Sequence, residues 1–168
     1  MTLAELNALD ARGFCAALEG VFEHSPWIVE RTSPSRPFES VAALHRALID
    51  TLGQASEAEQ LALLQAHPEL AGKAAVARTL TAASSSEQAS AGLDACTPEQ
   101  LGQLRALNRR YRERFGFPFI VAVRGLRREQ IIDALARRVE RERDAEFREC
   151  LAQVATIARL RLCTLLEA

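Results

Sequence analysis

Apolar residues recur every three to four positions along most of the chain, which is the spacing of amphipathic helices. One stretch breaks this pattern: residues 117–123 read FPFIVAV, a continuous apolar run rich in aromatic and β-branched residues. We therefore predict an all-α bundle of about eight to nine helices, with one extended segment near 117–123. Because 168 residues suffice for one ordinary domain and not for two, residues 1–168 are predicted to form a single compact domain.

Capping residues indicate where several of the helices begin. Side chains that can accept a hydrogen bond from a helix N-terminus precede the helical patterns that start after Thr2, Asp10, Ser40 and Ser56. Thr97, Pro98 and Gln100 form a stronger start signal, a capping box with proline at the first helical position. The long helix that begins there should end near Gly116, with Asn108 on its inner face, where a neighbouring backbone group is the expected partner of the amide.

Composition and charge narrow the classes of partner. The chain has 21 basic and 22 acidic residues, a net charge of -1, so no overall field favours nucleic acid or an anionic membrane. A small molecule or a protein is the expected partner. No secretory signal or membrane-spanning run is present, and the four cysteines show no metal-ligand spacing, so we predict a cytoplasmic protein with reduced thiols and no metal site.

A histidine next to a proline ends one of the helical patterns. The residue before a proline is pushed out of the helical region, so His67 must leave the helix while Pro68 starts the next turn, with Glu69 near its positive end. The imidazole is thereby held at a rigid corner. These residues alone leave two interpretations open, a helix cap and a reactive imidazole.

The stretch from Ser84 to Glu87 has the S-x-x-E pattern of a capping box. The common explanation is a helix that starts at Ser84, with Glu87 accepting from the Ser84 amide, and the alternative is a catalytic carboxylate. Gln88 beside it would ordinarily lie at the surface.

Two further features require partners. Arg161 interrupts the apolar stripe of the last helix, so its guanidinium must pair with a carboxylate: Glu87, a ligand or an internal ion-pair partner. The backbone of 117–123 has no predicted strand beside it, so its polar groups must meet either neighbouring helices or a planar, amide-rich ligand. The basic run from Arg127 to Arg143 is interpreted as a solvated helix face.

Five motifs together resemble one family. FEHSPW at 22–27, HPELAGK at 67–73, SSSEQASAGL at 84–93, LNRRYRERFGFPFIVAVRG at 107–125 and IARLRL at 157–162 resemble the 2-oxo-4-hydroxy-4-carboxy-5-ureidoimidazoline (OHCU) decarboxylases of urate breakdown. The resemblance implies an all-α homodimer that acts as a carboxy-lyase. Its reaction would convert the ureidoimidazoline to (S)-allantoin and CO2 without a cofactor.

The resemblance also assigns roles to individual residues. His67 matches the catalytic histidine, and the ordinary pKa of an imidazole, about 6.5, suits proton exchange near neutral pH. The positions that match substrate contacts are Pro68, the ring-holding Ser84, Glu87 and Gln88, the ureido-binding backbone of Phe119, Ile120, Val121, Ala122 and Val123, and Arg161 near the anionic side of the substrate.

Two other functions are compatible with parts of the sequence. A non-catalytic helical binding or regulatory module could use the arginines between 109 and 114, although the net charge argues against nucleic acid, and those arginines are more simply an exposed face or a dimer contact. A cofactor-free hydrolase or isomerase of a related ureide would need the same pocket. The residues alone do not separate this enzyme from a decarboxylase.

Overall fold

The computed structural model describes residues 1–71 and 81–166, and the chain forms two compact units. One comprises Met1–Ala66 and Ala155–Ala168, and the other comprises His67–Val154. All regular structure in the described residues is helical, with nine α-helices and no strand. This confirms the all-α prediction, whereas the single-domain organisation stays a prediction.

The first unit contains the N-terminal helices. They are α1 (Leu3–Ala8), α2 (Ala11–Ala17), α3 (Trp27–Thr32), the 3-10 turn η1 (Ser33–Ser35), α4 (Val41–Gly53) and α5 (Glu57–Ala66). The predicted caps are confirmed: Thr2, Asp10, Ser40 and Ser56 each accept from the backbone N–H three residues later, at 2.7 to 3.3 Å. The last part of α10 (Arg143–Leu165) completes this unit.

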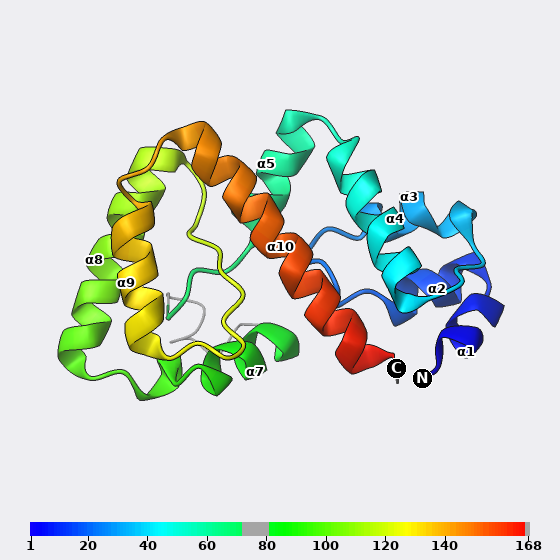
Figure 1. The fold of residues 1–168 in the computed structure, drawn as a ribbon, viewed down its shortest axis with the longest axis horizontal. Coiled ribbons are helices and arrows are strands. Elements are labelled where there is room, and N and C mark those ends of the chain that lie inside the picture. Colours follow the sequence, from blue (N-terminus) through cyan, green and yellow to red (C-terminus); the bar gives the residue numbers. More distant parts are fainter. Residues whose placement is uncertain (72–80, 167–168) are drawn as a thin grey trace. The chain divides into compact units, whose positions relative to one another are not determined.

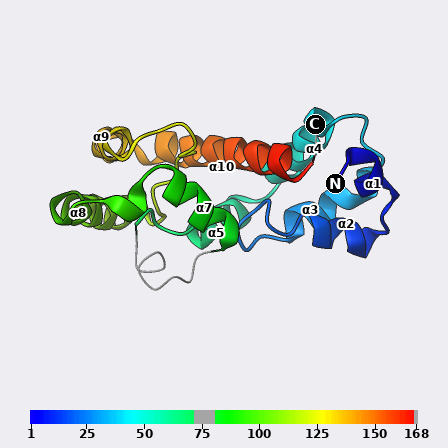
Figure 2. The same cartoon turned by 90° about the horizontal axis from the view of Figure 1, so that it is seen from below.

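Helices α1 to α4 pack on one another in sequence order, as Figures 1 and 2 show. Each turns an apolar face inward, represented by the fully buried Leu6, Phe14, Ile28 and Leu44. Trp27 is half-buried, and the Arg31 guanidinium stacks over its ring at 4.6 Å.

The second unit contains α7 (Ala82–Ser90), the 3-10 turn η2 (Leu93–Ala95), α8 (Pro98–Phe115), α9 (Arg128–Arg138) and the first part of α10. The capping box of α8 is confirmed in both directions: Thr97 Oγ1 accepts from Gln100 N–H at 3.2 Å, and Gln100 Oε1 accepts from Thr97 N–H at 3.1 Å. The helix ends as predicted, because Gly116 takes a φ of 80°, which glycine adopts without strain.

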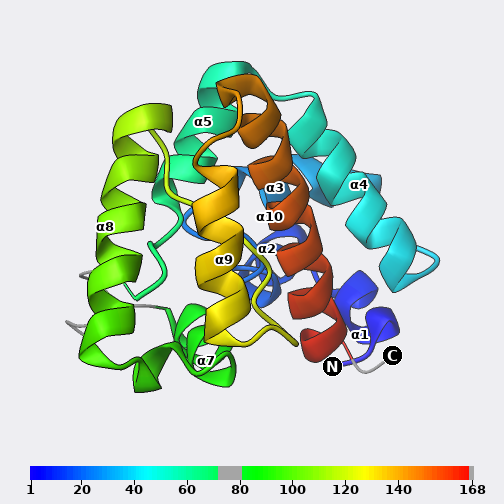
Figure 3. The same cartoon turned by 60° about the vertical axis from the view of Figure 1, so that its left-hand side comes forward.

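The expected extended segment joins α8 to α9. The two helices lie side by side and run in the same direction (Figure 3), so the chain between them must return along them, which Figure 1 shows. Residues 118–123 have no regular structure, which confirms the prediction. Phe117 and Phe119 anchor the segment, because both rings meet the buried Tyr111 edge-on, at centroid distances of 6.2 and 5.5 Å.

Helix hydrophobicity and the state of the cysteines also test the sequence predictions. No helix among them is both long enough and apolar enough to cross a membrane. The four cysteines are free thiols, as predicted, although Cys163 is exposed and Cys150 fully buried.

Candidate active site

His67 lies directly after the last residue of α5, as its proline neighbour predicts. Its side chain is buried, with a relative exposure of 8%. Pro68 and Glu69 are not helical, so the prediction that Glu69 occupies a first helical turn is wrong. Its carboxylate pairs instead with Arg112 of α8, with Oε1 and Nε 2.7 Å apart. Residues 72–80, which include Lys73 of the HPELAGK motif, lie outside the described residues.

Two buried amides hold the turn that follows His67. Gln88 of α7 accepts from the Ala71 N–H at 2.9 Å, and Asn108 of α8 donates to the Leu70 carbonyl at 2.9 Å. Ala71 has a φ of 50°, a left-handed conformation that residues with a Cβ rarely adopt. The backbone contact predicted for Asn108 is confirmed, whereas Gln88, expected at the surface, is buried. The histidine corner is therefore fixed from two helices.

Helix α7 brings the predicted residues of the SSSEQ motif to one face. Ser84, Glu87 and Gln88 are spaced i, i+3 and i+4, and side chains at this spacing are neighbours on a helix. Ser84 and Gln88 are buried and Glu87 is half-buried. Because Gln88 bonds Ala71, this face of α7 is directed at the turn after His67.

The predicted capping box at Ser84 is wrong. The N-cap is Thr81, whose Oγ1 accepts from the Ser84 N–H at 3.3 Å, so α7 begins at Ala82. Thr81 is itself a good N-cap residue and lies three positions earlier, so the helix gains almost a turn by starting there. Ser84 and Glu87 are consequently interior residues of the helix, and their side chains are not needed as the cap.

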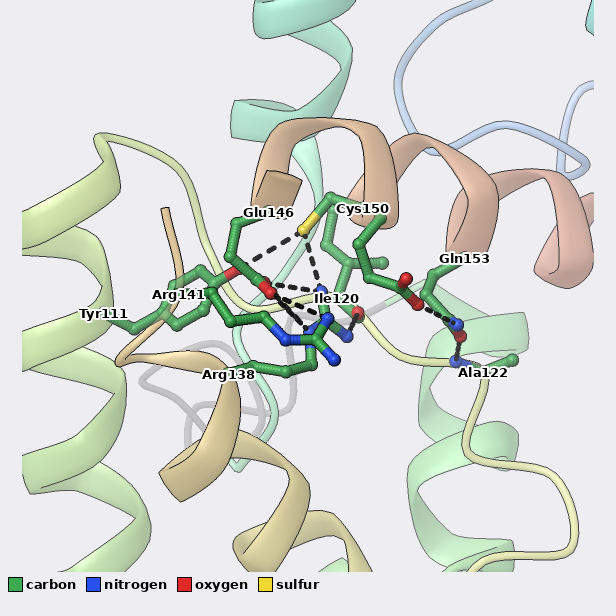
Figure 4. Close-up of polar contacts among 9 residues, drawn as sticks. Tyr111, Ile120, Ala122, Arg138, Arg141, Glu146, Cys150 and Gln153 are labelled. Carbon is green, nitrogen blue, oxygen red and sulfur yellow. Dashed lines mark hydrogen bonds and ion pairs between the residues drawn. The ribbon is translucent and has the colours of Figure 1, made fainter. Parts of the chain in front are cut away.

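The extended segment is fastened by side chains of α9 and α10, shown in Figure 4. Arg138 Nη1 donates to the Ile120 carbonyl at 2.9 Å, and the Ala122 N–H donates to Gln153 Oε1 at 2.9 Å. Neighbouring helices thus satisfy these two backbone groups, one of the two possibilities that the sequence leaves open. Residues 117–120 are buried, but Val121 and Ala122 are only half-buried.

Arg138 is the residue that the sequence interpretation misses. The basic run is predicted to be solvated, yet Arg138 is buried and forms an ion pair with Glu146 of α10, with N and O atoms 2.9 Å apart. Figure 4 shows Tyr111, which donates to Glu146, and Cys150, whose sulfur accepts from Arg138 at 3.3 Å. The signal was present in the spacing, because Arg138 continues the inward stripe of Ile131 and Leu135 at i+7 and i+3.

The network shifts the pKa values of its members. Burial raises the pKa of the Cys150 thiol, and burial together with neighbouring Cys150 and Glu146 raises that of the Tyr111 hydroxyl. Burial acts to lower the pKa of Arg138, but its hydrogen bond to Glu146 and its electrostatic interactions with Cys150, Glu146 and Tyr111 outweigh that effect and raise it. Arg138 is therefore charged where it contacts Glu146, and Tyr111 and Cys150 are neutral donors or acceptors beside it.

Arg161 belongs to the first unit and has an internal ion-pair partner there. Its Nη1 lies 2.9 Å from Glu23 Oε2 and donates to the Gly20 carbonyl at 3.1 Å. Both side chains of the pair are buried. The internal ion pair, one of the alternatives for this arginine, is thus present, and it explains how a charge is tolerated in an apolar stripe.

A comparison with protein families decides among the functions open to the sequence. The family model described as OHCU decarboxylase matches residues 7–163. The chain belongs to the OHCU decarboxylase family. A relative from Haloferax volcanii, named 2-oxo-4-hydroxy-4-carboxy-5-ureidoimidazoline decarboxylase, is 44% identical over 162 residues, which are 96% of this chain and 94% of the relative.

Two further matches are longer than this member of the OHCU decarboxylase family. The uric acid degradation bifunctional protein of a Bacillus species is 37% identical over 96% of this chain, which corresponds to 32% of that protein. A crystal structure described as (S)-allantoin synthase has a TM-score of 0.82 and 27% identity, and the match covers 99% of this chain and 54% of that one.

In this OHCU decarboxylase family member, the inner face of α8 connects the predicted site segments of the second unit. Asn108 bonds the turn after His67, Tyr111 one turn later meets Phe119, and Gln88 reaches the same turn from α7. The motifs HPELA and FPFIVAV therefore both contact α8, and SSSEQ contacts HPELA. The contact between Leu70 and Asn108 joins residues that are 38 positions apart in the sequence.

Proposed function

We propose that this protein catalyses the decarboxylation of OHCU to (S)-allantoin and CO2 in urate breakdown. The structural observation that carries the proposal is the hydrogen bond from the Ala71 N–H to Gln88, which joins the histidine motif to the face of α7 that bears Ser84 and Glu87. The 44% identity to a relative named for this reaction, over nearly the full length of both chains, supports the same substrate.

His67 is the proposed catalytic residue. Its position at a proline corner, backed by a turn that two amides hold, gives an imidazole of fixed direction. Such a group can accept or donate a proton at neutral pH, and it is proposed to engage the 4-hydroxyl of the substrate. Pro68 is proposed to contact the ring, and Ser84, Glu87 and Gln88 to hold and orient it.

The proposed reaction uses the substrate itself to receive electrons. The bond between the ring carbon and its carboxylate breaks, CO2 leaves, and the electron pair enters the conjugated ring, whose imine nitrogen takes a proton from water. His67 takes the hydroxyl proton as that oxygen becomes a carbonyl, and the carbon that bears the ureido group gains a proton on the open face. A cofactor-free reaction is part of this proposal, because the ring nitrogen and carbonyl groups can act as the electron sink.

The remaining predicted contacts complete the proposed binding mode. The backbone from Phe119 to Val123 is proposed to receive the ureido group, which is planar and carries amide donors and an acceptor. Arg161 is proposed to favour the anionic side of the substrate, a role that would use its charge in addition to the ion pair with Glu23. Exchange of Arg161 for lysine tests this role through the KM.

A homodimer in the cytoplasm completes the proposal. Both assignments come from the resemblance to the family, and we expect neither nucleic acid nor a membrane as a partner. Sedimentation velocity of the purified protein tests the dimer, which should sediment at twice the mass of an 18.5 kDa chain.

The activity is tested in an assay that generates OHCU from urate in the same solution. Urate is oxidised and the first product hydrolysed by auxiliary enzymes, so that OHCU forms continuously, and circular dichroism follows the allantoin. The protein should speed the appearance of the (S) enantiomer well above spontaneous decay, which yields both enantiomers. A rate and an enantiomer ratio equal to those without protein would refute the proposal.

A further inference from the structure

Among the described residues, side chains of α9 and α10 hold the extended segment 119–123 along one edge. Ile120 uses its carbonyl for Arg138, and Ala122 uses its N–H for Gln153. In an extended chain, the N–H and C=O of one residue face the same edge, and those of the next residue face the opposite edge. Ile120 and Ala122 therefore present their polar groups to α9 and α10, and Val121 between them presents its own to the other side.

The opposite edge is chemically suited to a ureido group. Among the described residues, no hydrogen bond uses the N–H or C=O of Val121 or the N–H of Val123, and Val121 is half-buried. A ureido group carries an N–H beside a C=O, as a peptide does. It can exchange two hydrogen bonds with Val121 in the way that paired strands do.

The direction of the Gln153 amide is set by its neighbour one turn earlier. Gln153 Nε2 donates to Glu149 Oε1 at 2.8 Å, an i to i+4 contact on α10. An ionised carboxylate only accepts hydrogen bonds, so the NH2 group of Gln153 must face Glu149. Its oxygen is then left for the Ala122 N–H, and Glu149, Gln153 and Ala122 form a chain of fixed polarity.

We propose that Gln153, oriented by Glu149, is a positioning residue that fixes the rotation of segment 119–123 and so presents the Val121 edge to the ureido group of the substrate. This inference rests on the proposed function. Arg138 acts on the same edge through the Ile120 carbonyl, and its burial beside Phe119, with its guanidinium 4.6 Å from the ring centroid, makes that end rigid. Gln153 is the more informative residue to change, because it is only half-buried and lies outside the ion pair of Arg138 and Glu146.

Two variants of Gln153 separate positioning from structural support. Gln153→Met keeps the length of the side chain and removes the acceptor of the Ala122 N–H. The exchanged pair E149Q/Q153E restores it: the new amide at 149 donates to the new carboxylate at 153, whose second oxygen accepts from Ala122. Gln103→Met, at an exposed position of α8, is the matched control for the same chemical change.

The readouts are kcat, KM and the enantiomer ratio of the allantoin, with the urea midpoint as the measure of stability. Q153M should raise KM and lower kcat/KM about five- to tenfold, with a smaller (S) excess, because one orienting hydrogen bond is lost. The kcat/KM of the exchanged pair should lie within about twofold of that of the natural protein, and the same is expected of Q103M. The urea midpoints of Q153M and Q103M should agree.

Two results would overturn the inference while the proposed function stands. One is an active natural protein whose Q153M variant keeps its kcat/KM and enantiomer ratio, and the other is an exchanged pair as impaired as Q153M. A natural protein without activity on OHCU would refute the proposed function, and the inference with it.

Discussion

The buried ion pair between Arg138 and Glu146 makes a large and specific prediction for stability. We compare Glu146→Gln with Glu140→Gln, since both remove the negative partner of an arginine and keep the side-chain shape. Glu146 is 0% exposed and its partner Arg138 is 8% exposed, whereas Glu140 and its partner Arg110 are 55% and 56% exposed. The two pairs have similar N to O distances, 2.9 and 2.6 Å, so they differ in burial and in the further contacts that Glu146 makes with Tyr111 and Arg141.

The expected magnitudes follow from this difference. Removing one member of a buried pair leaves the other charge without compensation in a medium of low polarity, which costs about 3–5 kcal/mol. The exposed pair is screened by water and contributes about 0–1 kcal/mol. Because about 1.4 kcal/mol changes an equilibrium tenfold, E146Q should shift the folding equilibrium by roughly two to four orders of magnitude, and E140Q by less than about one.

Urea denaturation followed by far-UV circular dichroism measures both variants. The slope of the free energy of unfolding against urea should stay unchanged, so that the shift in midpoint reports stability. If E146Q lost no more stability than E140Q, the buried pair would not support the fold as described, and the anchoring of segment 117–123 through Arg138 would need another explanation.

Two smaller predictions concern local features. Gly116→Ala should lower the free energy of unfolding by about 1 kcal/mol, because the φ of 80° at this C-cap of α8 suits glycine. Gly102→Ala, inside α8, should raise the free energy of unfolding by about 1 kcal/mol, because among the described residues nothing beyond its chain neighbours and the nearby helix backbone lies within 4 Å of the added methyl group. Urea midpoints check both, and equal shifts would contradict the reasoning. Hydrogen bonds from Arg31 and Ser56 lower the pKa of Glu59 to about 2 from its ordinary 4.5, so its contribution to stability is present above 4.5 and lost as the pH falls toward 2. Glu59→Gln should therefore lose less stability than the natural protein between about pH 4.5 and pH 2, the window that these two pKa values set. Parallel acid curves for the two proteins would contradict this.

Local rules predicted much of the fold. Caps such as Ser40 and Thr97, and the glycine stop of α8, act within one turn of the chain, so their hydrogen bonds could be read from spacing. The start of α7 was misplaced because Thr81 and Ser84 are both good caps three residues apart, and the sequence contains no signal that ranks them. The extended segment could be recognised by its lack of a helical period.

The family resemblance and unusual positions in the sequence pattern identify candidate site residues. They do not identify the residues with which these side chains pair. Arg161 was conspicuous in an apolar stripe, but its partner Glu23 lies 138 positions earlier in the chain. The charged neighbours of Arg138 predict a surface residue, although its spacing from Ile131 and Leu135 places it inward. Tertiary pairing of this kind depends on how helices pack, which the periodicity of one helix does not specify.

We propose that His67 supplies the chemistry at a corner held by α7 and α8. The most direct test of this role is to measure the rate of (S)-allantoin formation from OHCU by the His67→Asn variant and by the control variant His24→Asn. His24 is exposed and has a φ of 49°, which asparagine tolerates well, so the control should fold and act like the natural protein. We predict that H67N keeps its helical circular dichroism and loses the rate advantage over spontaneous decay, while H24N retains it. Near-normal turnover by folded H67N would contradict the account.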